Sequence, residues 1–461
     1  MYSAFIKKEL LSNIFSLRYA LTFALFIVLT LCATVTRTHV FTRQLDDYRQ
    51  TMGQRSHLTE EALKQNDAQA LQVVGTVIEQ EPNPLSIFAG GLENENTRSF
   101  RIVGFGEPRT GMRPLHNPSF GYFLNLDMVL IINLVCSLLA MLLVYDAVCG
   151  ERENGTLKVL LAGPLPRDTI IISKLVAGLI TLLVPLLLCW GISVFYVLLV
   201  GHITFTAEHA ARLFWIVATS VLYISFYFAL GIAVSSWVQH TTTTLAVCLF
   251  CWVIFVLAIP NLVPLAIKHF VPVPPVSKIV LEKDAITRYI EAELVPKWRA
   301  EASNAGEQEL WRMLQNIETR KAAEQHKRFE KVDQYYSTLI KRQAIANQQI
   351  SRISPSASFV FAATNYAGTG INDFLRLQSE IATYQRAFSR FDDELRVKTE
   401  RQQNNGPKLT TADYIAPLFM PRKVQLAAVV NTCWIDIVLL CGGSVMLLLI
   451  GVVGFMRYDP K

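Results

Sequence analysis

The stretch that decides the fold is Asp146-Ala-Val-Cys-Gly-Glu-Arg-Glu-Asn-Gly-Thr-Leu-Lys-Val-Leu-Leu-Ala-Gly-Pro-Leu-Pro-Arg-Asp-Thr169. It lies between two long apolar runs, residues 126–145 and 170–200. A helix needs about 20 predominantly apolar residues to cross a bilayer. Both runs are therefore predicted to span a membrane, and the short charged stretch between them emerges on one of its faces.

Within this stretch, residues 154–162 are predicted to form a short amphipathic helix. Leu157, Leu160 and Leu161 follow the i, i+3, i+4 spacing that places side chains on one side of a helix. Charged residues surround this apolar stripe: Glu151, Arg152, Glu153 and Lys158. The Gly163-Pro164 pair ends the predicted helix before the next span begins.

The order of residues here resembles the cytoplasmic coupling helix of ABC-2 type transporter permeases. The resemblance rests on Glu-Arg-Glu-x-Gly-Thr-Leu, then Leu-Leu, then Pro-x-x-Arg, then Lys174, placed between the second and third predicted spans. It implies docking into a cleft of an ATP-hydrolysing subunit, with charges at the rim and leucines in the cleft. The implied contact residues are Glu151, Arg152, Glu153, Gly155, Thr156, Leu157, Leu160 and Leu161. The alternative is a plain solvated loop.

Composition independently indicates a membrane protein. The 461 residues are 52% hydrophobic and 17% charged, whereas soluble domains carry about 25% charged residues. The net charge of +6 is spread along the chain, without the basic stripe of a nucleic-acid-binding protein. All eight cysteines lie in apolar runs or at their edges, so the polar segments are expected to fold without disulfides.

The fold class predicted is an all-α polytopic membrane protein with six transmembrane helices. The predicted spans are residues 19–36, 126–145, 170–200, 211–237, 243–267 and 425–456. Residues 1–18 are predicted to form an amphipathic elbow helix on the cytoplasmic surface, because Lys7, Lys8 and Arg18 precede the first span and favour an internal N-terminus. Residues 457–461 then form a cytoplasmic tail.

Two polar inserts, residues 37–125 and 268–424, are predicted to form a mainly helical extracytoplasmic domain. The first is broken by many glycines and prolines and contains one possible short strand beginning at Phe100. In the second, residues 307–353 and 371–403 are predicted to be long helices that pair as an antiparallel hairpin. Residues 353–370 between them are less charged and are expected to touch the outer leaflet or the membrane helices.

This layout, with a Ser-Pro…Ala-Gly-Thr-Gly stretch over 354–370, resembles the ABC-2 permeases grouped with multicopper-enzyme maturation and gliding motility. The resemblance implies a subunit of an ATP-driven exporter or extractor in the inner membrane of a prokaryote. Its implied partners are a cytoplasmic ATPase dimer, a second permease copy, the lipid bilayer and an extracytoplasmic protein. Nucleic acid is not expected as a partner.

The sequence predicts neither a catalytic residue nor a metal site. The phosphate-binding sequence Gly-x-x-x-x-Gly-Lys-Ser/Thr is absent, so ATP and magnesium are expected on the partner ATPase and no cofactor on this chain. The eight histidines are scattered, without carboxylates or cysteines at metal-ligand spacing. Nor does a serine or cysteine nucleophile have a nearby base.

Three polar residues inside predicted spans are candidates for the transport pathway. Asp436 lies about 15 Å into the last span at 1.5 Å per residue, and a carboxylate at that depth must pair or face a cavity. Asn431, one turn nearer the outside, is expected to share its face. Asn133 in the second span is the third candidate, with an interhelical hydrogen bond as the structural alternative for each.

Two rival functions remain open. A non-transporting membrane scaffold or mechanotransmitting subunit would use the external helices to dock a partner protein. A sensor would bind a ligand with its external domain. Transport requires a continuous cavity between protomers, which neither rival needs.

Overall fold

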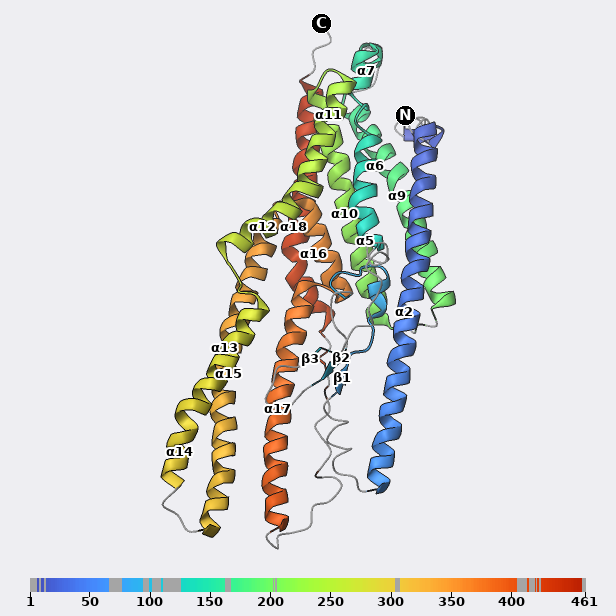
Figure 1. Ribbon diagram of the computed structural model, residues 1–461. Helices are drawn as coiled ribbons and strands as arrows, with labels where there is room; N and C mark the ends of the chain where they lie inside the picture. Colours follow the sequence, from blue (N-terminus) through green and yellow to red (C-terminus); the bar gives the residue numbers. More distant parts are fainter. Residues whose placement is uncertain are drawn as a thin grey trace.

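The computed structural model describes residues 6–7, 10–11, 14–65, 77–93, 99–101, 109–110, 126–161, 167–201, 203, 205–302, 307–403, 413, 419, 421–422 and 424–457. They form a bundle of apolar helices and, at one end of it, long helices that extend far beyond the bundle (Figure 1). The short helices of the charged stretch, the start of α2 and the end of α18 lie together at the opposite end.

Five helices in the described parts of the chain are long and apolar enough to cross a membrane. They are α2 (Leu17–Gln65), α9 (Arg167–Val200), α10 (Ala207–Trp237), the continuous run of α11 (Thr241–Trp252), η3 (Val253–Ala258) and α12 (Ile259–Phe270), and α18 (Leu426–Met456). The protein is thus a helical, multi-pass membrane protein, as predicted.

The second predicted span is shorter than the others. It consists of α5 (Met128–Ile131), the π-helical turn η2 (Ile132–Cys136) and α6 (Ser137–Leu142). At 1.5 Å per residue this run covers roughly 22 Å, against about 30 Å of hydrocarbon in a typical bilayer. The count of six spans therefore stays a prediction.

The first predicted span does not end where its apolar sequence ends. α2 continues through the predicted boundary at residue 36 as one helix that reaches Gln65. Arg37, the first residue of the predicted insert, is 4% exposed and donates from Nη2 to the Ser86 carbonyl at 2.6 Å. Ser86 belongs to the short helix η1 (Pro84–Ile87), so the first insert folds back onto α2.

The bundle is built around α10, whose most apolar stretch is 72% buried. It packs along α18, where glycines allow close approach. A methyl group at Gly443 would lie 2.7 Å from the Phe226 ring, and one at Gly454 would lie 2.7 Å from Trp237. Small residues at helix contacts are the usual means of close packing in membranes.

A further helix enters the bundle from the second insert. α16 (Pro355–Ala367) packs against α10 and α18 (Figure 1), and its Phe359, Ala362, Ala363 and Tyr366 are fully buried in the main core. Phe359 stacks on Tyr223 of α10 with ring centroids 4.4 Å apart. The segment thus lies among the apolar helices, which corrects the assignment of all of 268–424 to an external domain.

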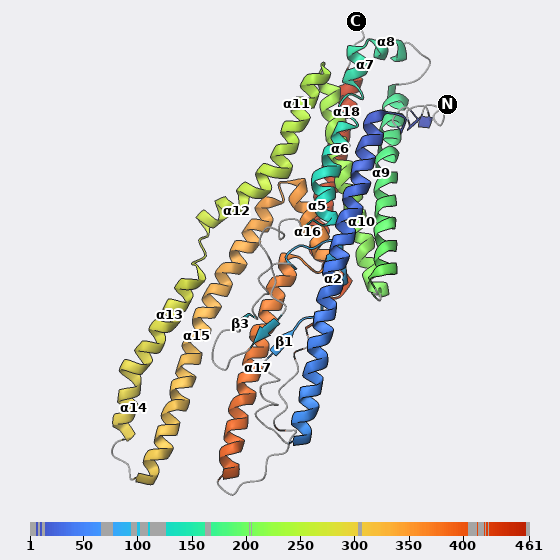
Figure 2. The ribbon, with the colours of Figure 1, turned by 45° about the vertical axis from the view of Figure 1, so that its right-hand side comes forward.

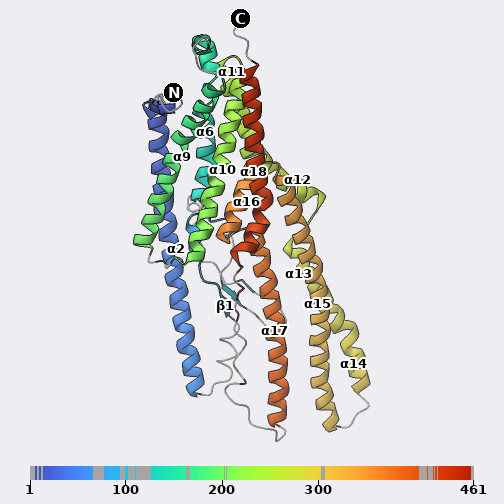
Figure 3. The ribbon, with the colours of Figure 1, turned by 180° about the vertical axis from the view of Figure 1, so that it is seen from behind.

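The helical hairpin outside the bundle pairs different helices from those predicted. α15 (Glu307–Ser351) packs against α13 (Val276–Tyr289), η4 (Ile290–Leu294) and α14 (Val295–Ala302) (Figures 1 and 3). Ile290, Val295 and Ile317 form the shared core. The contact of α15 with α17 (Ile371–Gln403) is sparser and includes an ion pair between Glu330 and Arg386 at 3.8 Å. The prediction that 307–353 pairs with 371–403 was wrong, because 276–302 supplies a nearer apolar partner.

A small antiparallel sheet packs on α17. The predicted strand at Phe100 is β2 (Ser99–Arg101), the middle of a sheet whose other strands are β1 (Val77–Glu79) and β3 (Arg109–Thr110). Ile78 of β1 is buried against Tyr384 and Phe388 of α17. The two inserts are thereby joined to each other outside the bundle.

Candidate functional site

The charged stretch forms two short helices at the end of the bundle where the chain termini lie (Figure 2). α7 (Cys149–Glu153) and α8 (Thr156–Leu161) are joined by Asn154 and Gly155. We call Cys149–Leu161 the α7–α8 segment. The sequence predicted one helix over 154–162; the observed break falls at Gly155, whose φ of +72° lies in the left-handed region that only glycine adopts freely.

The three charges of α7 point toward the bundle. Glu151 accepts from Lys174 Nζ of α9 at 2.7 Å, in a pair whose side chains are 23% and 9% exposed. Arg152 donates from Nη2 to the Ser236 carbonyl of α10 at 3.1 Å. In the structure these charges hold α7 to neighbouring spans, and their predicted role at the rim of an ATPase contact stays a prediction.

Glu153 makes the third tie. One carboxylate oxygen accepts from both the backbone N–H and the hydroxyl of Thr241, at 3.0 and 2.8 Å. Thr241 begins α11, and the first N–H groups of a helix lack partners within it. Glu153 therefore caps α11 from another part of the chain, and a negative charge is favoured at that end. The α7–α8 segment is thus attached to α9, α10 and α11 at once.

Leu157 holds α8 against the bundle by apolar packing. It is fully buried, in a cluster with Val148, Ile170 and Phe455. The side chains of Leu160 and Leu161 lie outside what the structure describes. The exposed residues of the segment are Glu153, Asn154, Gly155, Thr156 and Lys158. Among the described side chains, the surface open to a partner is therefore the Gly155 turn and the start of α8. The predicted contact of Leu160 and Leu161 stays a prediction.

The Glu153 tie gives a direct prediction. Hydrogen bonds from the Thr241 backbone and hydroxyl lower the pKa of Glu153, so its stabilising contribution is fully present at neutral pH and is lost only as pH falls through that lowered pKa. Glu153→Ala should loosen α7 from α11, so that cleavage of the α7–α8 segment by an added protease becomes several-fold faster at pH 7. Glu153→Gln, which still accepts a hydrogen bond, should raise the cleavage rate less. Equal cleavage rates in Glu153→Ala and the unmodified protein would contradict the bond to Thr241.

A second candidate site lies deep in the bundle. Asp436 of α18 is fully buried and accepts two hydrogen bonds from Arg352, from Nε at 2.7 Å and from Nη2 at 3.0 Å. Arg352 is 8% exposed and directly follows α15. Asp436 thus has the charged partner that a carboxylate deep inside a membrane requires.

Asn133 lies in the same region and bonds to α10 and α16. Its side-chain oxygen accepts from the hydroxyls of Tyr223 and Ser356, each at 2.7 Å. Asn431, by contrast, is exposed. It precedes Asp436 by five residues, which turns a helix by about 140° beyond one full rotation, so the prediction that the two share a face was wrong. Asp436 and Asn133 thus each bond to a side chain within residues 352–356, whereas Asn431 lies elsewhere on α18.

The sequence analysis missed Arg352, Tyr223 and Ser356. For Arg352 a signal exists: it is the one charged residue between Arg342 and Asp373, just as Asp436 is the one charged residue in α18. Two isolated opposite charges, each in an uncharged helical stretch, predict a pair. Tyr223 and Ser356 carry no comparable signal, since hydroxyls are common in membrane helices.

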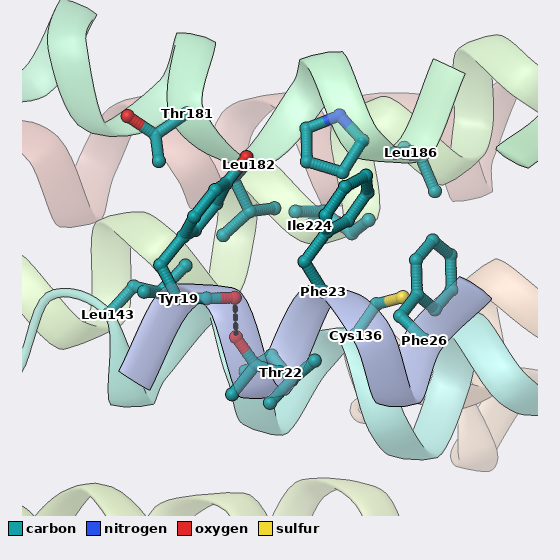
Figure 4. A pocket seen from close by; sticks show the side chains of 12 residues that line it. Tyr19, Thr22, Phe23, Phe26, Cys136, Leu143, Thr181, Leu182, Leu186 and Ile224 are labelled. Carbon is teal, nitrogen blue, oxygen red and sulfur yellow. Dashed lines mark hydrogen bonds between the residues drawn. The ribbon is translucent and has the colours of Figure 1, made fainter. Parts of the chain in front are cut away.

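A small cavity lies between α2, α6, α9 and α10 (Figure 4). It is lined mainly by apolar side chains, among them Phe23, Phe26, Leu182 and Ile224, with Tyr19 and Thr22 near one end. Its volume of about 40 Å³ admits only a few water-sized groups.

Comparison with known proteins identifies the family of this helical, multi-pass membrane protein. A family model described as ABC-2 family transporter protein matches residues 3–460. A protein of Stutzerimonas stutzeri named "Probable ABC transporter permease protein NosY" is 31% identical over 124 residues, 26% of this chain and 44% of that protein. The matched stretch thus covers less than half of the relative. Because the family model spans nearly the whole chain, the protein belongs to the ABC-2 family of ABC transporter permease subunits.

Proposed function

We propose that this permease subunit is driven by a cytoplasmic ATPase that docks on the exposed face of the α7–α8 segment. Permease subunits of the family lack ATPase activity and pair with ATPase subunits, so ATP and magnesium belong to the partner. The observation that carries the proposal is the triple attachment through Glu151, Arg152 and Glu153. A displacement of the segment by the ATPase would be transmitted to α9, α10 and α11 together through these three side-chain bonds. A solvated loop would not need such bonds.

The orientation proposed is cytoplasmic for the α7–α8 segment and both termini. These parts lie at one end of the bundle and the long helices at the other (Figures 1 and 2), and the lysines before the first span favour an inner location. The elbow helix over 1–18 falls largely outside the described residues. A second copy of the chain completes the transporter, because one chain supplies only half of a two-subunit permease.

The long helices outside the bundle support membership of the branch with large external inserts and the presence of an extracytoplasmic partner protein. An exporter or extractor is the function proposed. The mechanotransmitting alternative is also favoured by a specific observation: α15 ends at Ser351, and the next residue, Arg352, is bonded to Asp436 inside the bundle, so the external part of α15 is joined to the spans. The substrate follows from neither feature.

Co-purification tests the proposal. The tagged chain, extracted in a mild detergent, should retain a P-loop ATPase that is absent from a purification of an unrelated multi-pass protein. Adding the purified permease back to that ATPase should stimulate ATP hydrolysis. If no ATPase co-purifies in the absence or presence of ATP, ADP or a non-hydrolysable analogue, the proposal fails.

A further inference from the structure

The junction between α15 and α16, residues 352–354, connects the long external helix α15 to a helix buried in the bundle. α15 ends at Ser351 and α16 begins at Pro355. Figure 3 shows α15 leaving the bundle end and continuing far past it. At 1.5 Å per residue the 45 residues of α15 extend roughly 68 Å. The external helices have two further links to the bundle: α15 packs on α12, with Gln343 donating to the Val271 carbonyl at 2.8 Å, and α13 follows α12 in the chain. The junction is the direct covalent link from α15 to the interior of the bundle.

Three side chains fix the junction to three different membrane elements. Arg352 is held by Asp436 of α18 in a two-bond ion pair with 6% and 0% of the side chains exposed. The Ser354 hydroxyl donates to the Phe255 carbonyl of η3. The Ser356 hydroxyl donates to Asn133 of η2 at 2.7 Å. The junction is therefore bonded to α18, η3 and η2 within five residues.

Two of these attachment points are π-helical turns. Phe255 lies in η3 and Asn133 in η2, and the indole N–H of Trp252, just before η3, donates to Ser137, just after η2, at 2.8 Å. A π-helical turn interrupts the regular hydrogen bonding of a helix and is a common place for a bend. The junction is thus bonded where the second and fifth apolar runs deform most easily.

The external helices α13, η4, α14 and α15 are bonded to one another at several points. Lys283 of α13 pairs with Asp333 of α15 at 2.6 Å, and Lys321 of α15 pairs with Glu291 of η4 at 2.9 Å. Tyr336 of α15 donates to Glu282 of α13 at 2.8 Å. Together with their shared apolar core, these pairs hold α13, η4, α14 and α15 in a single unit, which we call the external lever.

We propose that residues 352–356, pinned by the Arg352–Asp436 pair, are the fulcrum through which bundle movement tilts the external lever. The inference rests on the proposed function, which supplies the movement. A tilt of about 5° at the fulcrum displaces the far end of a helix of this length by roughly 6 Å. The ATPase thereby acts on an extracytoplasmic partner by moving α13–α15. Arg352 and Asp436 are positioning residues in this scheme and contact no substrate.

The test measures lever movement separately from ATPase binding. Spin labels at two exposed positions, Leu58 on α2 and Ser337 on α15, report the distance between the two external helices. The background replaces the exposed Cys32 and Cys441 by serine. The labelled chain is diluted with unlabelled chain, assembled with its ATPase, and compared without nucleotide and with ATP trapped on the ATPase.

In the unmodified fulcrum the distance distribution should shift by several ångströms when ATP is trapped. Asp436→Asn should reduce that shift by at least half while the ATPase still co-purifies and still binds nucleotide. The matched control is Asp413→Asn, which removes the exposed Lys398–Asp413 pair outside the bundle and should leave the shift unchanged. A full shift in a folded Asp436→Asn protein overturns the inference.

If Asp436→Asn does not fold, the double variant Ser354→Ala/Ser356→Ala decides the question, because it removes two attachments without burying an unpaired charge. A shift reduced by half supports the fulcrum, and a full shift overturns it. Loss of ATPase co-purification from the unmodified chain would contradict the proposed function itself. Retained ATPase without any shift in the unmodified chain would contradict only the fulcrum.

Discussion

Replacing Asp436 by leucine is expected to destabilise the protein by about 3–5 kcal/mol, because it leaves the Arg352 guanidinium buried without a counter-charge. Arg352 has 6% of its side chain exposed and points both Nε and Nη2 at the lost carboxylate. Unfolding by a denaturing detergent, followed by the exposure of buried cysteines such as Cys433, measures the change.

The double variant Arg352→Met/Asp436→Leu is the matched control. Replacing both members of a buried pair by apolar residues of similar volume is often neutral or stabilising, so the double variant should recover most of the lost stability. If the single variant matches the unmodified protein, the pair does not exist in the membrane. If the double variant is as unstable as the single one, the loss of stability does not come from the unpaired charge of Arg352.

Gly155→Pro is expected to reduce permease-stimulated ATP hydrolysis by at least tenfold while membrane insertion stays normal. Proline fixes φ near −65°, whereas Gly155 has φ +72° in the turn that sets α8 against α7. The substitution also removes the N–H that donates to the Arg152 carbonyl at 3.2 Å. The reaction to follow is ATP hydrolysis by the partner subunit in the presence of reconstituted permease.

Gly155→Asn separates backbone geometry from side-chain contact. Asparagine enters the left-handed region more readily than other non-glycine residues, and no atom lies within 4 Å of a methyl group placed at Gly155. The asparagine variant should therefore retain most of the stimulation. Normal stimulation by Gly155→Pro would show that the shape of the turn is unimportant and would remove the α7–α8 segment from the proposed contact.

The sequence predicted the helical membrane fold and the location of the short charged segment because both depend on local patterns. Long apolar runs are read directly from the chain, and the order of residues over 151–174 carried the family resemblance. The end of the first span was different: α2 continues to Gln65, because polar residues can prolong a helix beyond the bilayer without a break.

The roles of individual charges could not be predicted in the same way. Glu151 finds Lys174, and Glu153 finds Thr241, 88 positions away, so their inward direction depends on tertiary packing. Predicting the proposed fulcrum would have required pairing Arg352 with Asp436, which lie 84 positions apart in the sequence. Only the isolation of each charge in an uncharged stretch hinted at it. The helix pairing outside the bundle failed for the same reason, since several amphipathic helices offered α15 an apolar face.

Docking of the ATPase at the turn between α7 and α8 is central to the proposed function. The direct measurement places a photo-activated cross-linking residue at exposed Thr156 in the co-purified complex and, as a control, at exposed Ser337 on the external lever. We expect a cross-link from Thr156 to the ATPase and none from Ser337. A cross-link from Ser337, or none from Thr156 in any nucleotide state while the ATPase remains bound, would contradict the proposed docking.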